Sequence, residues 1–126
     1  MASSELDVLI HDLETRHDMY VANLDGAVNA LAALLPGAVT KDLTAERLST
    51  TDGVMHVADE AYPNWSVNIH GRANETDGHW RCTLRRSDSR DNDSVIGSGR
   101  APVLSQAILA AVLRLAAHHR THPAED

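Results

Sequence analysis

The stretch that decides the fold reads Trp65-Ser-Val-Asn-Ile-His70, followed after a polar interval by His79-Trp-Arg-Cys-Thr-Leu-Arg85. In both segments apolar and polar residues alternate, which is the period of a strand that buries one face. The interval between them contains the turn-forming residues Asn74, Asp77 and Gly78. The pattern therefore predicts an antiparallel hairpin.

A register that pairs Ile69 with Trp80 puts every apolar side chain of this hairpin on one face. That face consists of Trp65, Val67, Ile69, Trp80, Cys82 and Leu84. The opposite face carries Ser66, Asn68, His70, His79, Arg81, Thr83 and Arg85. In this register His70 lies directly opposite His79, and Cys82 is expected to be an unreactive core residue.

The chain after the hairpin predicts one more strand and one helix. A polar turn over 87–93 precedes a third, weaker strand over 94–100. Pro102 favours the start of a helix over 101–120, with an apolar stripe that includes Leu104, Ile108 and Leu115. The helix is expected to fray at His118, and residues 121–126 are expected to form a tail.

The N-terminal segment, 1–36, has helical periodicity. Its apolar positions recur in alternate steps of four and three, with one polar break: Leu6, Ile10, Leu13, His17, Tyr20, Leu24, Ala27, Leu31 and Leu34. Gly26 weakens a continuous helix, so one long helix and two helices broken near 21–26 both remain open. A single long helix has apolar surface to spare and predicts a homodimer through Leu6, Ile10, Leu13, His17, Tyr20, Leu24 and Leu31.

Between these parts, residues 38–53 predict a linker that allows a helical turn over 44–48, and residues 54–58 allow a short strand. The whole chain, 1–126, is then a single α+β domain. Its N-terminal helical segment, its three-stranded antiparallel meander (within 54–100) and its C-terminal helix form a two-layer sandwich, with the helices on the apolar face of the sheet.

Composition is that of a globular protein of 126 residues, 43% apolar and 23% charged. The net charge of −7 is uneven: residues 1–63 hold eleven Asp and Glu against three Lys and Arg, whereas residues 64–126 hold seven against eight. The single cysteine excludes an intramolecular disulfide. Because the chain shows neither a membrane-length apolar run nor a signal peptide, we expect a cytoplasmic protein without a membrane partner.

Three groups of chemistry-bearing residues fall short of known sites. The cluster of His118, His119 and His122 has no nearby third carboxylate ligand, and Pro123 follows directly. The aspartates at 88, 91 and 93 lack the spacing and the final glutamate of a calcium loop. The run Gly97-Ser98-Gly99 lacks the lysine of a phosphate-binding loop. We therefore predict no metal, no cofactor and no catalytic residues.

Basic residues cluster around the second hairpin, at Arg81, Arg85, Arg86, Arg90 and Arg100. Such a cluster is typical of nucleic-acid contact. The predicted register, however, turns both Trp residues toward the core, and the chain as a whole is acidic. Because of these two observations, direct nucleic-acid binding through this hairpin and the polar sheet face is the alternative hypothesis for function and not the first.

The segments W-x-V at Trp65, W-x-C-x-L-R at Trp80 and the helix that begins Ala101-Pro-Val-Leu-Ser-Gln-Ala-Ile-Leu resemble a family of small phage and prophage proteins. This is the phage ABA-sandwich group, which is similar to double-stranded-RNA-binding domains, and the resemblance covers residues 65–117. It implies a mobile-element origin and, with that, docking onto a host protein complex. No activity is agreed for the family.

From these observations we predict a non-enzymatic protein-binding module. It would act as a phage-type accessory or inhibitor that docks onto a host complex concerned with nucleic-acid binding or defence. The binding residues proposed from the sequence are Asp7, Asp12, Glu14 and Asp18 in the acidic half and His70, His79, Arg81, Arg85 and Arg86 in the basic half.

Overall fold

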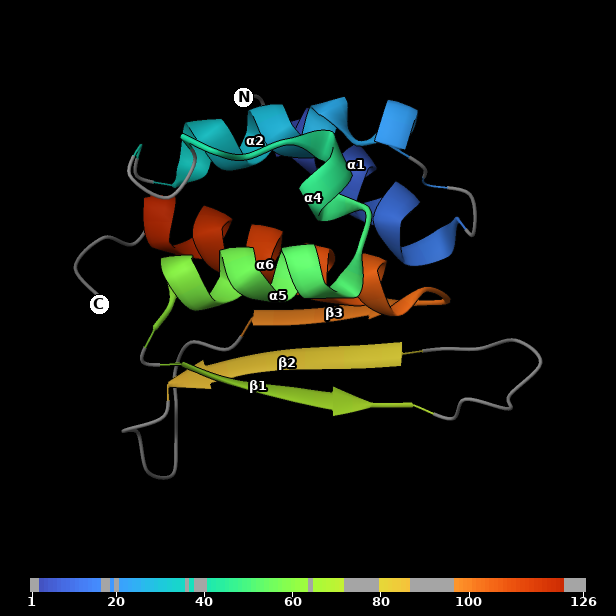
Figure 1. The fold of residues 1–126 in the computed structure, drawn as a ribbon, viewed down its shortest axis with the longest axis vertical. Helices are drawn as coiled ribbons and strands as arrows, with labels where there is room; N and C mark the ends of the chain where they lie inside the picture. The colour runs from blue at the N-terminus through green and yellow to red at the C-terminus, as the bar shows by residue number, and fades with distance from the viewer. Residues whose placement is uncertain are drawn as a thin grey trace.

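The computed structural model describes residues 3–16, 19, 21–35, 37, 41–63, 65–71, 80–86 and 97–121. In chain order its elements are α1 (Ser3–Thr15), η1 (Val21–Asn23), α2 (Asp25–Leu34), α4 (Ala45–Leu48), α5 (Thr51–Ala61), β1 (Trp65–His70), β2 (Trp80–Arg86), β3 (Gly97–Ala101) and α6 (Leu104–Thr121), as Figure 1 shows. The predicted α+β fold, with helices before and after a three-stranded antiparallel sheet, is confirmed.

The sheet is a meander in the order β1-β2-β3, but its first register differs from the predicted one. Val67 pairs with Leu84 and Ile69 pairs with Cys82, a shift of two residues. A pattern of period two cannot distinguish registers that differ by two, since each side chain stays on the same face. The predicted faces therefore hold, and Cys82 is fully buried.

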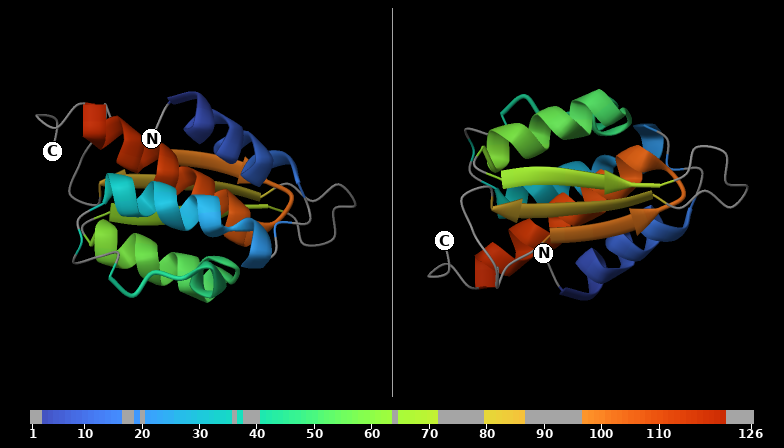
Figure 2. Two further views of the ribbon diagram at one scale, coloured as in Figure 1. Left: turned by 90° about the horizontal axis from the view of Figure 1, so that it is seen from above. Right: turned by 90° about the horizontal axis from the view of Figure 1, so that it is seen from below.

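Helix α6 is the centre of the core. Every residue from 105 to 113 is buried, so this helix is enclosed on all sides and not along one stripe. Figures 1 and 2 show the sheet on one side of α6 and α2 on the opposite side, with α1 and α5 along its flanks. All helices consequently lie on one face of the sheet. The expected fraying at His118 is wrong, because α6 continues to Thr121.

Two glycines let β3 lie directly on α6. A Cβ atom at Gly99 would stand 2.1 Å from the carbonyl oxygen of Ala107, and one at Gly97 would stand 2.8 Å from that of Ala111. Neither position has room for a side chain, which explains the run Gly97-Ser98-Gly99 as strand packing.

The N-terminal segment forms two helices, the second of the two alternatives. α1 ends at Thr15 and α2 begins at Asp25, with the turn η1 between them. Most of the described seam residues are buried within the chain itself, namely Ile10, Leu13, Leu24 and Leu31. Leu6 is half-buried, while His17 and Tyr20 lie outside the described residues. The single long helix on which the dimer prediction depended is therefore not formed. The apolar faces of α1 and α2 instead pack against the core of the same chain.

The strand allowed over 54–58 is wrong, and much of the expected linker is helical. Thr44 and Thr50 cap α4 and α5, since their Oγ1 atoms accept hydrogen bonds from the backbone N–H of Arg47 (3.2 Å) and of Gly53 (3.0 Å). The apolar spacing of α5 is helical, and it buries Val54, Val57 and Ala58. The strand prediction for 54–58 did not take account of Thr50, whose side chain caps the N-terminus of a helix.

Candidate binding surfaces

The face of the sheet opposite the helices is open and polar. All of the helices cover the other face (Figures 1 and 2), which leaves this one to solvent. The three strands contain no Asp or Glu. By strand alternation the open face is formed by Ser66, Asn68, His70, Arg81, Thr83, Arg85, Ser98 and Arg100. We call these residues the open sheet face.

The pairing of the strands places the basic residues of this face in a row. Arg81 stands between His70 on β1 and Arg100 on β3. Cross-strand neighbours on one face have Cβ atoms about 5 Å apart, and like charges at that distance repel. His70, Arg81 and Arg100 are all exposed. An anion bound over this row would relieve the repulsion between the two arginines.

Several of the predicted site residues do not meet as expected. His70 faces Arg81 and not His79, so the predicted histidine pair is wrong for the same reason as the register. His79 itself lies outside the described residues, and of Arg86 only the backbone is described. Arg81 and Arg85 are exposed on the open sheet face as predicted.

The two tryptophans lie on the core side of the sheet. Trp65 and Trp80 are half-buried and pack against the core, and the Trp65 ring contacts the Tyr62 ring edge-on at 5.6 Å between centroids. The open sheet face therefore has no Trp or Tyr on its three strands. Bases could stack there only on the His70 imidazole or on arginine guanidinium planes, so an anionic partner would be held chiefly by charge and hydrogen bonds.

The predicted acidic residues of α1 have different roles in the structure. Asp7 is exposed and Asp12 is half-buried, while Asp18 lies outside the described residues. Exposed acidic residues also occur along α2, α4 and α5 and just before α4, where sequence reasoning placed no binding residue: Asp25, Asp42, Glu46, Asp52, Asp59 and Glu60. The helical side is thus acidic over several elements, in contrast to the open sheet face.

Glu14 is engaged within the fold and closes the edge of β3. Its carboxylate accepts two hydrogen bonds from the Arg114 guanidinium, at 2.5 and 2.6 Å, and one from the backbone N–H of Arg100 at 3.0 Å. Arg114 also donates to the carbonyl of Ser98 at 2.8 Å. The ion pair thus gives the outer edge of β3 an acceptor and a donor, as a neighbouring strand would.

The environment of Glu14 acts on its pKa in two opposite ways. Burial, the largest single cause, raises the pKa of the carboxyl group, but the hydrogen bonds from the Arg114 side chain and the Arg100 backbone, together with the charges of Arg114 and His11, outweigh it. The pKa consequently lies below its ordinary value of 4.5. Glu14 is therefore ionised at neutral pH and unsuited to donating a proton.

Gln106, a buried residue of α6, holds the C-terminal end of α1 in place. It is buried, and its Nε2 atom donates to the carbonyl of Leu13 at 2.8 Å and to the carbonyl of Arg16 at 2.6 Å. These bonds satisfy carbonyls at the C-terminal end of α1. Sequence reasoning missed Gln106 and Arg114, although Arg114 is the one charged residue between Leu104 and Ala117. A charge within an apolar helix is a usable signal for a paired partner.

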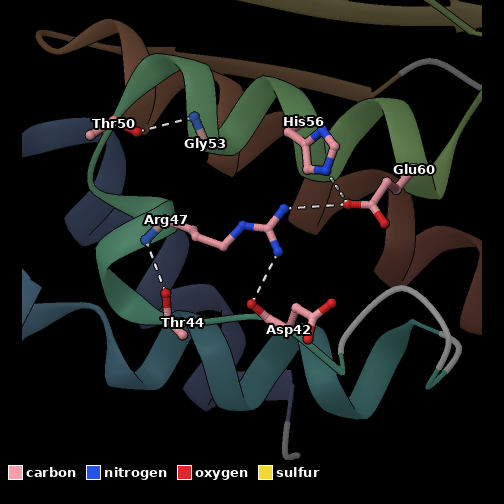
Figure 3. Close-up of polar contacts among 7 residues, drawn as sticks. All are labelled: Asp42, Thr44, Arg47, Thr50, Gly53, His56 and Glu60. Atoms are coloured by element: carbon pink, nitrogen blue, oxygen red, sulfur yellow. Dashed lines mark hydrogen bonds and ion pairs between the residues drawn. The ribbon is translucent and has the colours of Figure 1, made fainter.

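A second polar cluster braces α4 against α5 (Figure 3). The Arg47 guanidinium donates to the carbonyl of Asp42 at 3.0 Å and to Glu60 Oε1 at 3.3 Å. The same oxygen lies 2.8 Å from His56 Nε2, which is one turn away on α5. The cluster ties three successive segments together on the acidic helical side. The cluster contains one carboxylate and one imidazole, both partly exposed, and its bonds hold the segments of the fold together.

Catalytic or metal-binding groups do not converge within the described ranges. No group of three His, Cys, Asp or Glu close enough to hold a metal occurs among these residues. His122 and the aspartates at 88, 91 and 93 lie outside them. Burial raises the pKa of the Cys82 thiol to about 11, so almost none of it is thiolate at neutral pH.

The chain was compared with protein families, with curated proteins and with solved structures. Neither the protein-family models nor the curated proteins nor the solved structures gave a match. Among the helices of the described part, none has both the length and the apolar character to cross a bilayer. The case for function therefore rests on the surfaces themselves.

Proposed function

We propose that the protein is a non-enzymatic module that binds a protein partner, and that charge segregation directs this binding. The observation that carries the proposal is the contrast between an acidic helical side and an open sheet face whose strands have no carboxylate. When a molecule has two oppositely charged sides, the electric field of a complementary partner orients it before contact. This orientation accelerates association and limits the ways in which the two molecules can dock.

The partner that fits the acidic helical side is a protein with a basic, nucleic-acid-binding surface. Exposed carboxylates on α2, α4 and α5 would meet its Lys and Arg residues in place of phosphates. We further propose that the protein is a phage-type accessory or inhibitor that acts on a host complex in the cytoplasm. This part of the proposal rests on the sequence pattern of residues 65–117, for which no family model gave a match. No catalytic step is part of the proposal.

The test is affinity purification from a bacterial lysate at low salt, with three forms of the protein side by side. The wild type should recover a defined partner. Asp52→Lys with Asp59→Lys should lose it, because both carboxylates are exposed on α5. Arg81→Glu with Arg100→Glu, the matched reversal on the open sheet face, should keep it. Failure of the wild type to recover any partner, or equal loss by both variants, would contradict the proposal.

A second candidate function, nucleic-acid binding by the open sheet face, is favoured by one specific observation. Arg81 and Arg100 are direct cross-strand neighbours, and a phosphate between them would offset their repulsion. Binding should then weaken steeply with salt, and Arg81→Ala should reduce the slope of log affinity against log salt by about one. Lys41→Ala, an exposed cation outside the sheet, is the control and should leave the slope unchanged. Absence of a mobility shift at low salt rejects this candidate.

A further inference from the structure

The outer edge of β1 offers backbone groups for a further strand. At the other edge, the N–H of Arg100 and the carbonyl of Ser98 point outward to Glu14 and Arg114. Since alternate residues of a strand direct both backbone groups to the same side, the pairing can be followed across the sheet. Arg100 is opposite Arg81, so Arg81 directs its groups to β1 and bonds His70. The residues between, Val67 and Ile69, must then point their N–H and C=O groups away from the sheet.

Hydrogen bonds elsewhere in β1 agree with this alternation. The N–H of Trp65, which has the same parity as Val67, turns away from β2 and donates to the Tyr62 carbonyl at 3.1 Å. Among the described residues, neither Val67 nor Ile69 makes a backbone hydrogen bond outside the sheet. The edge of β1 therefore presents two outward donor–acceptor pairs, whereas at the edge of β3 the Arg100 N–H and the Ser98 carbonyl are bonded by Glu14 and Arg114.

The side chains of β1 that face the core are incompletely covered. Val67 is half-buried and Ile69 is 37% exposed, whereas their partners Leu84 and Cys82 on β2 are at most 1% exposed. Burial thus falls from β3 and β2 toward β1. Apolar surface at this edge is left for another element to cover.

Helix α5 overhangs this edge. In both views of Figure 2, α5 runs beside β1 and outside the outline of the three strands. His56 and Glu60 lie on the flank of α5 that faces α4 (Figure 3), and β1 lies on the other side of α5 (Figure 1). At 100° per residue the flank of α5 opposite His56 and Glu60 carries Met55, with Asp59 at its solvent margin. Asp52 lies one turn before His56 and so shares the side of α5 that faces α4. Met55 is half-buried, and Asp59 is exposed.

The sequence of β1 carries none of the usual protection of an edge strand. Natural edge strands are blunted by Lys or other charges, by Pro, by bulges or by a covering element. β1 reads Trp-Ser-Val-Asn-Ile-His and contains no charged residue and no Pro, whereas β2 has three Arg. An unprotected edge under an overhanging helix has the geometry of a strand-addition site.

We propose that the partner protein binds by adding an extended segment to the outer edge of β1, beneath α5. The segment would pair with the backbone of Val67 and Ile69. Its alternate apolar side chains would cover Ile69 and meet Met55, and a basic residue at one end would lie near Asp59. This inference rests on the proposed protein-binding function, and adds the surface and the conformation of the partner.

The test titrates the labelled protein with the peptide acetyl-Lys-Val-Thr-Val-Thr-Val-Lys-amide at millimolar concentration. Amide resonances of Val67 and Ile69 should shift and their hydrogen exchange should slow, while the Arg100 amide should not change. A peptide with Pro for the central Val lacks the donor and should have no effect. Ile69→Lys should weaken peptide binding about tenfold or more. Val8→Lys is the matched control, because Val8 is also an exposed hydrophobic (61%) but lies on α1, and should bind like the wild type.

The outcomes separate this inference from the proposed function. Peptide shifts confined to Arg81 and Arg100, or no shifts at all, overturn strand addition. Recovery of the lysate partner by both wild type and Ile69→Lys keeps the proposed function and also overturns strand addition. A dimer that Ile69→Lys abolishes, without any peptide effect, would show that a second copy occupies the edge and would overturn the proposed occupant.

Discussion

The two edges of the sheet are finished in opposite ways. At β3, α1 lies along the edge, and the Glu14–Arg114 ion pair bonds the outward N–H of Arg100 and the outward carbonyl of Ser98. At β1 the described residues supply no such cover, and Ile69 remains partly exposed. A three-stranded sheet has only two edges, so a fold that closes one and leaves the other has a preferred side for adding structure.

The comparison shows that edge protection in this protein is a long-range property. Glu14 is 86 positions from Arg100, whose N–H it bonds, and the ion pair that holds Glu14 to Arg114 spans 100 positions. Arg114 itself is 16 positions from Ser98, whose carbonyl it bonds. Closure therefore depends on α1, α6 and β3 all being in place.

The largest expected effect concerns the packing of β3 on α6. Gly99→Ala should lower the free energy of unfolding by about 3 kcal/mol, because its Cβ would collide with the backbone of Ala107. Gly26→Ala is the control. A Cβ at Gly26 meets only Leu9 Cδ1, at 3.9 Å, so this change should stabilise α2 by about 0.5 kcal/mol. Urea unfolding of both variants measures this, and equal effects would show that β3 is not pressed against α6.

A smaller effect is expected from removing the edge cap. Glu14→Ala should cost about 1–2 kcal/mol, since it leaves the Arg100 N–H and the Arg114 guanidinium without their acceptor. Partial exposure of Arg114 (43%) keeps the loss in this range. Exchange of the Arg100 amide should accelerate more than exchange of amides in β2. Asp7→Ala, which changes an exposed acidic residue on the same helix, is the control and should change neither the stability nor the exchange rate. An unchanged Arg100 exchange rate in Glu14→Ala would show that Glu14 does not protect the edge of β3.

The smallest expected effect is the dependence of this cap on pH. Because the folded pKa of Glu14 is lowered, its ionisation stabilises the fold above the ordinary value of 4.5, and this stabilisation is lost as pH falls through the folded pKa. The wild type should therefore exceed Glu14→Gln in stability at pH 7 by more than it does at pH 3. Unfolding midpoints of the two proteins at each pH measure this difference. The other carboxyl groups titrate in both proteins, so their contributions cancel. A difference that is the same at both pH values would contradict the assignment.

Much of the fold was accessible from local pattern. The alternation at Trp65 and Trp80 correctly gave the hairpin faces, and the predicted helical segment over 1–36 ends close to the end of α2 at Leu34. The register was not accessible, since a shift of two residues leaves both faces unchanged. The helix α5 was missed because Val54 and Val57 were weighed without the cap at Thr50.

The candidate site was accessible only in part. Sequence reasoning placed Arg81 and Arg85 on the polar face of the sheet, where they lie. It treated Glu14 as a binding residue, whereas the fold uses this carboxylate to close β3. The acidic residues of α5 were missed as a surface, because that segment was not expected to be a helix.

The sequence by itself determined which residues alternate, which segments are apolar and where charge accumulates, because these depend on neighbours a few positions apart. Only the tertiary structure decided that α6 is enclosed on all sides, that Glu14 meets Arg114, and that the described residues cover the edge of β3 but not the edge of β1. Those outcomes depend on contacts between residues up to 100 positions apart, for which the chain carries no short-range pattern. Their energy is realised only when the elements that hold both partners have packed together.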